Sequence, residues 1–240
     1  MATYGLMVEN ERDELVLSDS GITYSFVGRA TFVSITPPGT SATLSGAGFS
    51  TYTIDWPGQI TVALPVKTNG GTVFRSAVQS GNTWTITVHK SNGASNSLGF
   101  DEQEQTEVYV FGAPGRPPTG TWGVFLFDDA GNVLADLSRR PLSFLARIST
   151  SNDAEEWAFP GGTYVPLVIG TLAGGSRYSA PGPNNLHNIR TSAVAWRINS
   201  STGKLFQDEY QIRFARDDAP GTTYTVRFPF NALLVDGTGL

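Results

Sequence analysis

The sequence predicts an all-β protein made of two tandem, internally duplicated β-sandwich domains of the immunoglobulin or fibronectin type. Three observations lead to this prediction. Apolar residues alternate with polar residues far more often than they recur at helical spacing. The 27 glycines and 14 prolines among 240 residues would interrupt long helices almost everywhere. Finally, the first half of the chain aligns on the second half.

Alternation is clearest from Thr83 to Val88, where Trp84, Ile86 and Val88 share one face and three threonines share the other. A half-buried antiparallel strand has this pattern. The same alternation recurs near the C-terminus, at Tyr224, Val226, Phe228 and Phe230. We therefore expect both segments to be strands with one apolar face in a core.

Short turn signals separate such runs, because glycine supplies a positive φ without steric cost. They are Pro37-Pro38-Gly39, Asn69-Gly70-Gly71, Asn92-Gly93, Asp129-Ala130-Gly131-Asn132, Gly174-Gly175, Thr202-Gly203 and Asp236-Gly237. The best helix candidate is Ser151 to Ala158, which has Asp153, Glu155 and Glu156 in its first turns and ends before Pro160. We expect one or two helical turns there at most.

Two blocks of the chain repeat. Residues 3–31 align without a gap on residues 121–149 at a constant offset of 118. Residues 56–77 align on residues 159–180 at an offset of 103, with eight identities in 22 positions. A period above 100 residues is too long for a solenoid repeat and suits a whole β-sandwich. We therefore interpret the chain as two copies of one domain.

The predicted domains cover residues 1–115 and 116–240, joined by the proline- and glycine-rich stretch from Gly112 to Gly120. The boundary is uncertain by about ten residues. This is because Thr121-Trp122-Gly123-Val124 also resembles Thr223-Tyr224-Thr225-Val226, so that strand closes the first domain or opens the second.

Charge and composition exclude several functional classes. The net charge is −5, and acidic and basic residues are interspersed, so no basic stripe exists to bind nucleic acid. The chain has no cysteine, which fits maturation in a reducing cytoplasm. The N-terminus lacks the pattern of a signal peptide, and no stretch approaches the roughly 18 apolar residues of a membrane span. We expect a soluble protein without a membrane span.

Residues suited to catalysis or metal binding are sparse, and we predict no catalytic, cofactor-binding or metal-binding residues and no cofactor. His89 and His187 have no second ligand at a suitable spacing. G-x-S-x-G and phosphate-loop motifs are absent from the sequence. The acidic candidates for a glycan hydrolase lie in polar connections and are read as solvated loops: Asp101, Glu102, Glu104, Asp153, Glu155, Glu156, Asp208 and Glu209. Asp128, Asp129 and Asn132 lack the spacing of a calcium loop.

Aromatic residues make up 11% of the chain and could stack on sugars. Trp84 and Trp196 occupy matching strand positions, which is typical of core residues. Trp56 and Phe159, each followed by Pro-Gly, are also read as structural. The candidates for exposed contacts are Trp157, Tyr164 and Tyr178.

A resemblance to a known family is carried by three segments, Tyr4-Gly5-Leu6-Met7-Val8-Glu9-Asn10, Glu14-Leu15-Val16-Leu17-Ser18 and Tyr24-Ser25-Phe26. They resemble the start of small tail proteins of long-tailed bacteriophages that infect Gram-negative hosts. In those proteins an aromatic-Gly strand, a polar turn and a second strand ending in Asp or Ser come first. Trp122-Gly123-Val124 and Val133-Leu134-Ala135-Asp136 repeat the pattern. The tandem duplication departs from single-domain relatives.

The resemblance implies a structural, non-enzymatic virion protein of the tail tip or baseplate, made in the host cytoplasm. Its expected partners are further copies of itself, with a trimer as the guessed state, neighbouring tail proteins, and a host glycan or receptor. It carries over no catalytic residue. The alternative is a carbohydrate-binding module or glycan hydrolase acting on the bacterial surface, and a surface adhesin is a third class.

Overall fold

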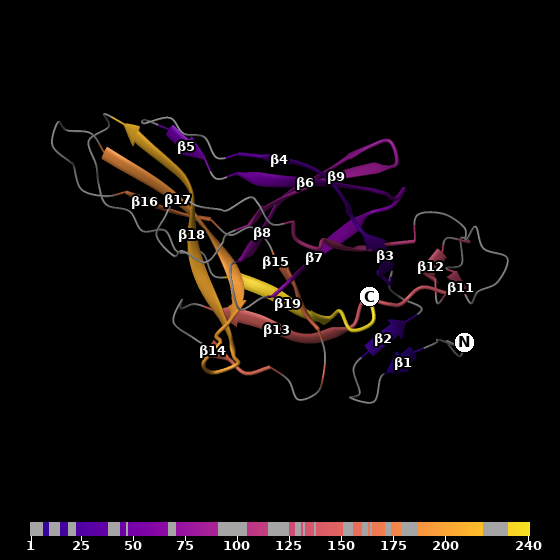
Figure 1. Cartoon of the computed structure of the whole chain (residues 1–240). Coiled ribbons are helices and arrows are strands. Elements are labelled where there is room, and N and C mark those ends of the chain that lie inside the picture. Colours follow the sequence, from indigo (N-terminus) through magenta and orange to yellow (C-terminus); the bar gives the residue numbers. More distant parts are fainter. Residues whose placement is uncertain are drawn as a thin grey trace, which may run out of the picture.

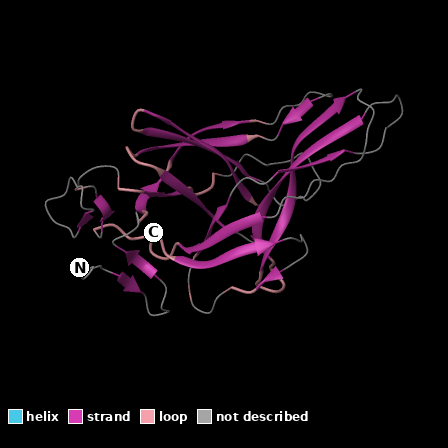
Figure 2. Cartoon of the chain, turned by 180° about the vertical axis from the view of Figure 1, so that it is seen from behind, coloured by secondary structure: helices cyan, strands magenta, loops and turns pink. Residues whose placement is uncertain are grey.

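The computed structural model describes the residues that form the strands and their nearest connections. These are residues 7–9, 15–18, 23–37, 44–46, 48–66, 71–90, 105–114, 125–127, 131, 133–136, 138–150, 156–159, 163, 165–170, 174–178, 187–217 and 230–240. Over these residues the protein is all-β, with several antiparallel sheets and no helix (Figures 1 and 2). The predicted fold class is confirmed to that extent.

A six-stranded antiparallel sheet forms the centre of the molecule and contains strands from both aligned halves. Its order is β13 (Phe144–Thr150), β19 (Phe230–Asp236), β15 (Pro166–Gly170), β7 (Ile60–Pro65), β10 (Tyr109–Gly112) and β3 (Ser25–Arg29). The halves join where β7 pairs with β15. One hydrogen-bonded sheet therefore crosses the predicted boundary at residue 115.

Two further sheets, of four and five strands, lie beside this one. The first contains β4 (Thr31–Thr36), β6 (Phe49–Asp55), β9 (Thr83–Lys90) and β8 (Thr72–Ser80), in that order. The second contains β14 (Glu156–Trp157), β18 (Leu205–Asp217), β17 (His187–Ile198) and β16 (Gly174–Tyr178), and β5 (Leu44–Gly46) also pairs with β18. In Figure 1 the long β17–β18 hairpin extends from the central sheet toward β5.

Side-chain alternation along β7 explains how these layers pack. Val62 and Leu64 belong to a first core with Tyr52, Ile86, Val88, Val108 and Val110, between the central and four-stranded sheets. Val168 lies opposite Leu64 and belongs to a second core, between the central and β14–β18–β17–β16 sheets, with Val66, Ile148, Leu205, Ala232 and Leu234. Both cores therefore lie on one face of the central sheet. Full burial of each valine or leucine contributes about 1.5–3 kcal/mol.

The opposite face of the central sheet has a third core. Ala63, between Val62 and Leu64, points to this face and packs with Tyr109, Phe111, Leu167 and Val235. The C-terminal Leu240 packs against the same core. Near it, the segment before β13 lies along β3: Ser25 bridges Pro141, and the Leu142 amide donates to the Tyr24 carbonyl at 2.8 Å. The strands at the two ends of the sheet are thereby brought close to one another around this core.

Two small hairpins occupy aligned positions of the sequence. β1 (Met7–Glu9) pairs with β2 (Leu15–Ser18), and β11 (Phe125–Phe127) pairs with β12 (Val133–Asp136). All four strands keep the offset of 118 found in the sequence. The register is the same in both hairpins, and each has an irregularity after its second residue.

Contacts between the halves also follow the sequence alignment. Leu64 aligns with Leu167, and Pro65 aligns with Val168. In the β7–β15 pair, Leu64 lies opposite Val168 and Pro65 lies opposite Leu167. Equivalent residues thus exchange partners, as they do across a twofold axis.

Several local predictions can be compared with the described residues. On β9, Ile86 and Val88 are fully buried and Thr85 is exposed, which confirms the predicted alternation. Thr202-Gly203 forms the predicted turn, with Gly203 at a φ of 67°. Of the predicted C-terminal strand, Phe230 begins β19, and residues 224–228 lie outside the described residues.

Two predictions are wrong. Glu156–Trp157 forms strand β14 rather than the end of a helix, because its backbone pairs with β18 and Trp157 packs on the second core. Residues 151–155 of that predicted helix lie outside the described residues. Gly174 and Gly175 begin β16 instead of forming a turn, since they pair with Ala193 and Ser192 of β17. In both cases tertiary pairing outweighs the local preference.

Candidate functional site

The two histidines lie on strands of different sheets. His89 is 5% exposed on β9, and its Nδ1 lies 2.8 Å from the Gly48 carbonyl oxygen. Its ring packs edge-on against Phe49, and burial lowers the pKa of its imidazole. His187 lies opposite Asp217 at one end of the β17–β18 pair. Among the described residues, no three His, Cys, Asp or Glu side chains group as metal ligands.

Of the acidic candidates for a hydrolase, the structure describes the side chain of Glu156 and the backbone of Asp208 and Glu209. Asp208 and Glu209 are neighbours on β18, and they lie opposite Ala195 and Val194 of β17. The Glu156 carboxylate accepts hydrogen bonds from the side chains of Asn199 and Thr202, which ties β14 to the β17–β18 turn. The remaining acidic candidates lie outside the described residues, as do Asp128, Asp129 and Asn132.

Trp157, one of the candidates for an exposed contact, is instead part of the second core. Its ring packs edge-on against Trp196 with centroids 5.3 Å apart, and Phe159 packs on the same core. Trp196 and Phe159 are thus structural, as predicted. Tyr164 lies outside the described residues, and of Tyr178 only the backbone is described.

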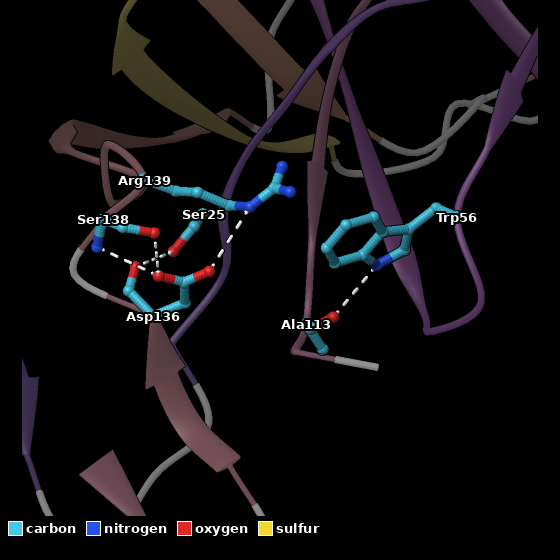
Figure 3. Close-up of polar contacts among 6 residues, drawn as sticks. All are labelled: Ser25, Trp56, Ala113, Asp136, Ser138 and Arg139. Carbon is cyan, nitrogen blue, oxygen red and sulfur yellow. Dashed lines mark hydrogen bonds and ion pairs between the residues drawn. The ribbon is translucent and has the colours of Figure 1, made fainter. Parts of the chain in front are cut away.

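Trp56 anchors a junction between the aligned halves (Figure 3). Its Nε1 donates to the Ala113 carbonyl oxygen at 2.9 Å, and its backbone oxygen accepts from Trp84 Nε1 at 3.1 Å. Both tryptophans are therefore structural, as predicted. The Arg139 guanidinium lies 4.9 Å from the centroid of the Trp56 ring, a cation–π contact that joins the second half to the first.

Arg139 is held in turn by Asp136, at the end of β12. The Arg139 Nε lies 3.4 Å from Asp136 Oδ2, and the backbone and hydroxyl of Ser138 donate to Oδ1. Ser25 of β3 donates to the Asp136 carbonyl oxygen at 3.4 Å. Figure 3 shows these side chains turned toward one another beside Trp56. The Asp136 carboxylate is thus engaged on both oxygens within the protein.

Two further arginines connect the chain end to the central sheet. Arg140 lies 3.3 Å from the carboxylate of Asp236, the last residue of β19. Arg29 donates at 2.6 Å both to Glu107 and to the Leu240 carbonyl oxygen, and lies 5.2 Å from the centroid of Tyr109. Burial and the hydrogen bond to Glu107 raise the pKa of the Tyr109 hydroxyl.

These contacts fasten separate segments of the chain to one another. Each arginine is shared between a carboxylate or carbonyl oxygen and, for Arg29 and Arg139, an aromatic ring, which fixes its position by several weak contacts. Sequence reasoning missed Asp136 and Arg139 as a unit, although both lie in the aligned block. The only available signal was that block's repetition, which does not reveal a partner as distant as Trp56.

Comparisons with protein-family models, curated proteins and solved structures gave no match. Within the described residues, no helix is long and apolar enough to cross a membrane.

Proposed function

We propose that this chain is a structural, non-enzymatic component of the tail tip or baseplate of a long-tailed phage, built from two copies of one β-sandwich unit. The observation that carries the proposal is the pair of hairpins β1–β2 and β11–β12. They are paired strands at the positions of the family resemblance, ending in Ser18 and Asp136, and they share one register at the aligned positions.

The duplication is part of the same proposal. It is supported by the mirrored strand order of the central sheet, where the aligned strands β3 and β13 lie at opposite ends and β7 and β15 meet in the middle. Each half contributes three strands to this sheet and packs a second sheet on it. The two copies would thus be fused as an internal pseudo-dimer, with residues 1–115 and 116–240 as the units.

A structural role also agrees with how the candidate groups are used. The candidate aromatic residues Trp56 and Trp157, and Arg139, make contacts within the protein. These side chains therefore contribute to the stability of the fold. The proposed partners are further copies of the chain, neighbouring tail proteins and a host-surface receptor or glycan. The proposed location is the virion tail, after synthesis in the host cytoplasm.

Purified phage particles from cultures that carry this gene provide the test. Peptide mass spectrometry should detect the chain at a fixed ratio to the known tail proteins, and immunogold labelling should mark the tail end. Absence from the particles, together with a strictly monomeric purified protein, would refute the proposal. A glycan array and an assay of reducing-sugar release test the hydrolase alternative. A structural protein should release no sugar.

A further inference from the structure

The four-stranded sheet has an outer face made largely of hydroxyl-bearing residues, with Phe49, Val73 and His89 on the same face at one end. The inward residues Tyr52, Ile86 and Val88 fill the first core, so their neighbours on β6 and β9 point outward. The register aligns these outward residues in rows across β4, β6, β9 and β8. We call this the hydroxyl face: Thr31, Ser34, Thr51, Thr53, Ser76, Val78, Ser80, Thr83, Thr85 and Thr87.

The hydroxyl face has one charge at each end. Asp55 is exposed at one end, where its carboxylate accepts a 2.5 Å hydrogen bond from Thr83. Arg75 is exposed toward the other end, where its guanidinium lies 4.1 Å from the centroid of Phe49. The residues of the hydroxyl face between them carry no charge. The face is therefore neutral overall but negative at one end and positive at the other.

Both edge strands of this sheet carry features that hinder strand-to-strand pairing. β4 and β8 each have one hydrogen-bonded neighbour, each has a register shift that marks a bulge or irregularity, and β8 also carries the charged Arg75. Val78 is 62% exposed on β8 and Val33 is 54% exposed on β4. Exposed apolar side chains and few charges are typical of the centre of a protein interface.

We infer that the hydroxyl face packs on the same face of a second copy of this chain, around a twofold axis parallel to the sheet and midway between Asp55 and Arg75. This arrangement places Asp55 of each copy against Arg75 of the other. Hydroxyl groups both donate and accept hydrogen bonds. The rows of hydroxyl-bearing residues between Asp55 and Arg75 can therefore pair with the same rows of a second copy. Two sheets can pack face to face about 10 Å apart in this way.

The proposed function already includes further copies of the chain as partners. This inference assigns the surface of one such contact, and it does not depend on the chain being a tail protein. A twofold contact of this kind pairs chains in twos, so the guessed trimer would need a different surface. We expect a weak dimer, so the average mass should rise with protein concentration.

Sedimentation equilibrium of the full chain tests the surface. The unmodified protein should form dimers as its concentration rises toward about 1 mM, the weak end of specific association. Thr85→Arg places a charged side chain at the centre of the hydroxyl face and should leave the protein monomeric. Thr163→Arg, at an exposed position outside the sheet, is the matched control and should dimerise normally. A monomeric unmodified protein, or dimers of Thr85→Arg, would overturn the inference.

Charge reversal tests the orientation. Asp55→Arg and Arg75→Asp should each weaken the dimer about tenfold or more, because like charges then face each other. The double variant restores opposite charges and should recover dimerisation to within about threefold. Unchanged single variants, or a double variant as weak as the singles, would refute this arrangement. The purified chain alone is used, so the outcome is separate from its presence in virions.

Discussion

At the scale of single residues, Gly112 is required by the close approach of Trp56. A Cβ atom at position 112 would lie 2.3 Å from Trp56 Nε1, which real structures do not tolerate. Gly112→Ala should therefore lower the free energy of unfolding by about 1–3 kcal/mol, as overpacking does. Urea denaturation measures this change.

Gly170→Ala is the control for this prediction. Its added Cβ would meet its nearest neighbours at 3.8 Å, an ordinary contact, so the change should stay under about 0.5 kcal/mol. Equal effects of the two substitutions would show that the Trp56 contact is not what requires glycine at position 112.

His89 should make stability depend on pH. Burial lowers the pKa of His89 below its ordinary 6.5, the Gly48 hydrogen bond opposes this, and the positive charge of Arg75 lowers it further. The unfolded chain therefore takes up a proton before the folded chain does as pH falls. The stability that neutral His89 contributes is fully present above pH 6.5. It is lost as the pH falls toward the lowered pKa of His89 in the folded protein.

Urea denaturation between about pH 7.5 and 5 measures this dependence. His89→Gln keeps a side-chain donor for the Gly48 carbonyl but does not titrate, so this variant should show a smaller loss of stability on acidification. An identical pH dependence in the variant would contradict the assignment to His89.

At the scale of elements, the tryptophan pair connects β14 to β17 across β18. Trp157 and Trp196 pack edge-on, a geometry worth about 0.5–1.5 kcal/mol beyond the buried area. A double-mutant cycle with Trp157→Ala and Trp196→Ala should give a coupling energy of that size in denaturation experiments. Trp84→Ala, in the other sheet, should be additive with Trp157→Ala. Additive effects of Trp157→Ala and Trp196→Ala would show that the contact between the two rings contributes no coupling energy.

Aligned strands of the two halves differ in how deeply their side chains are buried. Aligned positions need not be equally buried: Phe26 packs on the third core, whereas its counterpart Phe144 is 44% exposed on the end strand β13. The aligned hairpins share a register because register follows from the local residue pattern of the paired strands. Burial differs because it depends on the surrounding segments.

At the scale of the whole molecule, the central sheet should make the two halves depend on each other. β7 pairs with β15, and Ser25 of β3 bridges Pro141. A fragment of residues 1–115 would expose the edge of β7 and the residues that pack beside it. We therefore expect the intact chain to unfold in one cooperative transition, and fragments 1–115 and 116–240 to lack native near-UV circular dichroism when separate.

Mixing the two fragments in equal amounts provides the control, because it restores the missing strand partners and should recover part of the native signal. Two separate transitions in the intact chain, matching those of independently folded fragments, would contradict this expectation. That result would instead favour two self-sufficient domains joined by a linker.

The sequence by itself determined the all-β class, the faces of β9 and the aligned positions of the two hairpins. These follow from alternation, turn residues and repetition, which are local or register properties. Only the tertiary structure decided that β7 joins β15, that Glu156–Trp157 is a strand, and that Arg139 lies on Trp56. A strand's pattern shows which side is apolar but does not name the distant segment that satisfies its backbone hydrogen bonds.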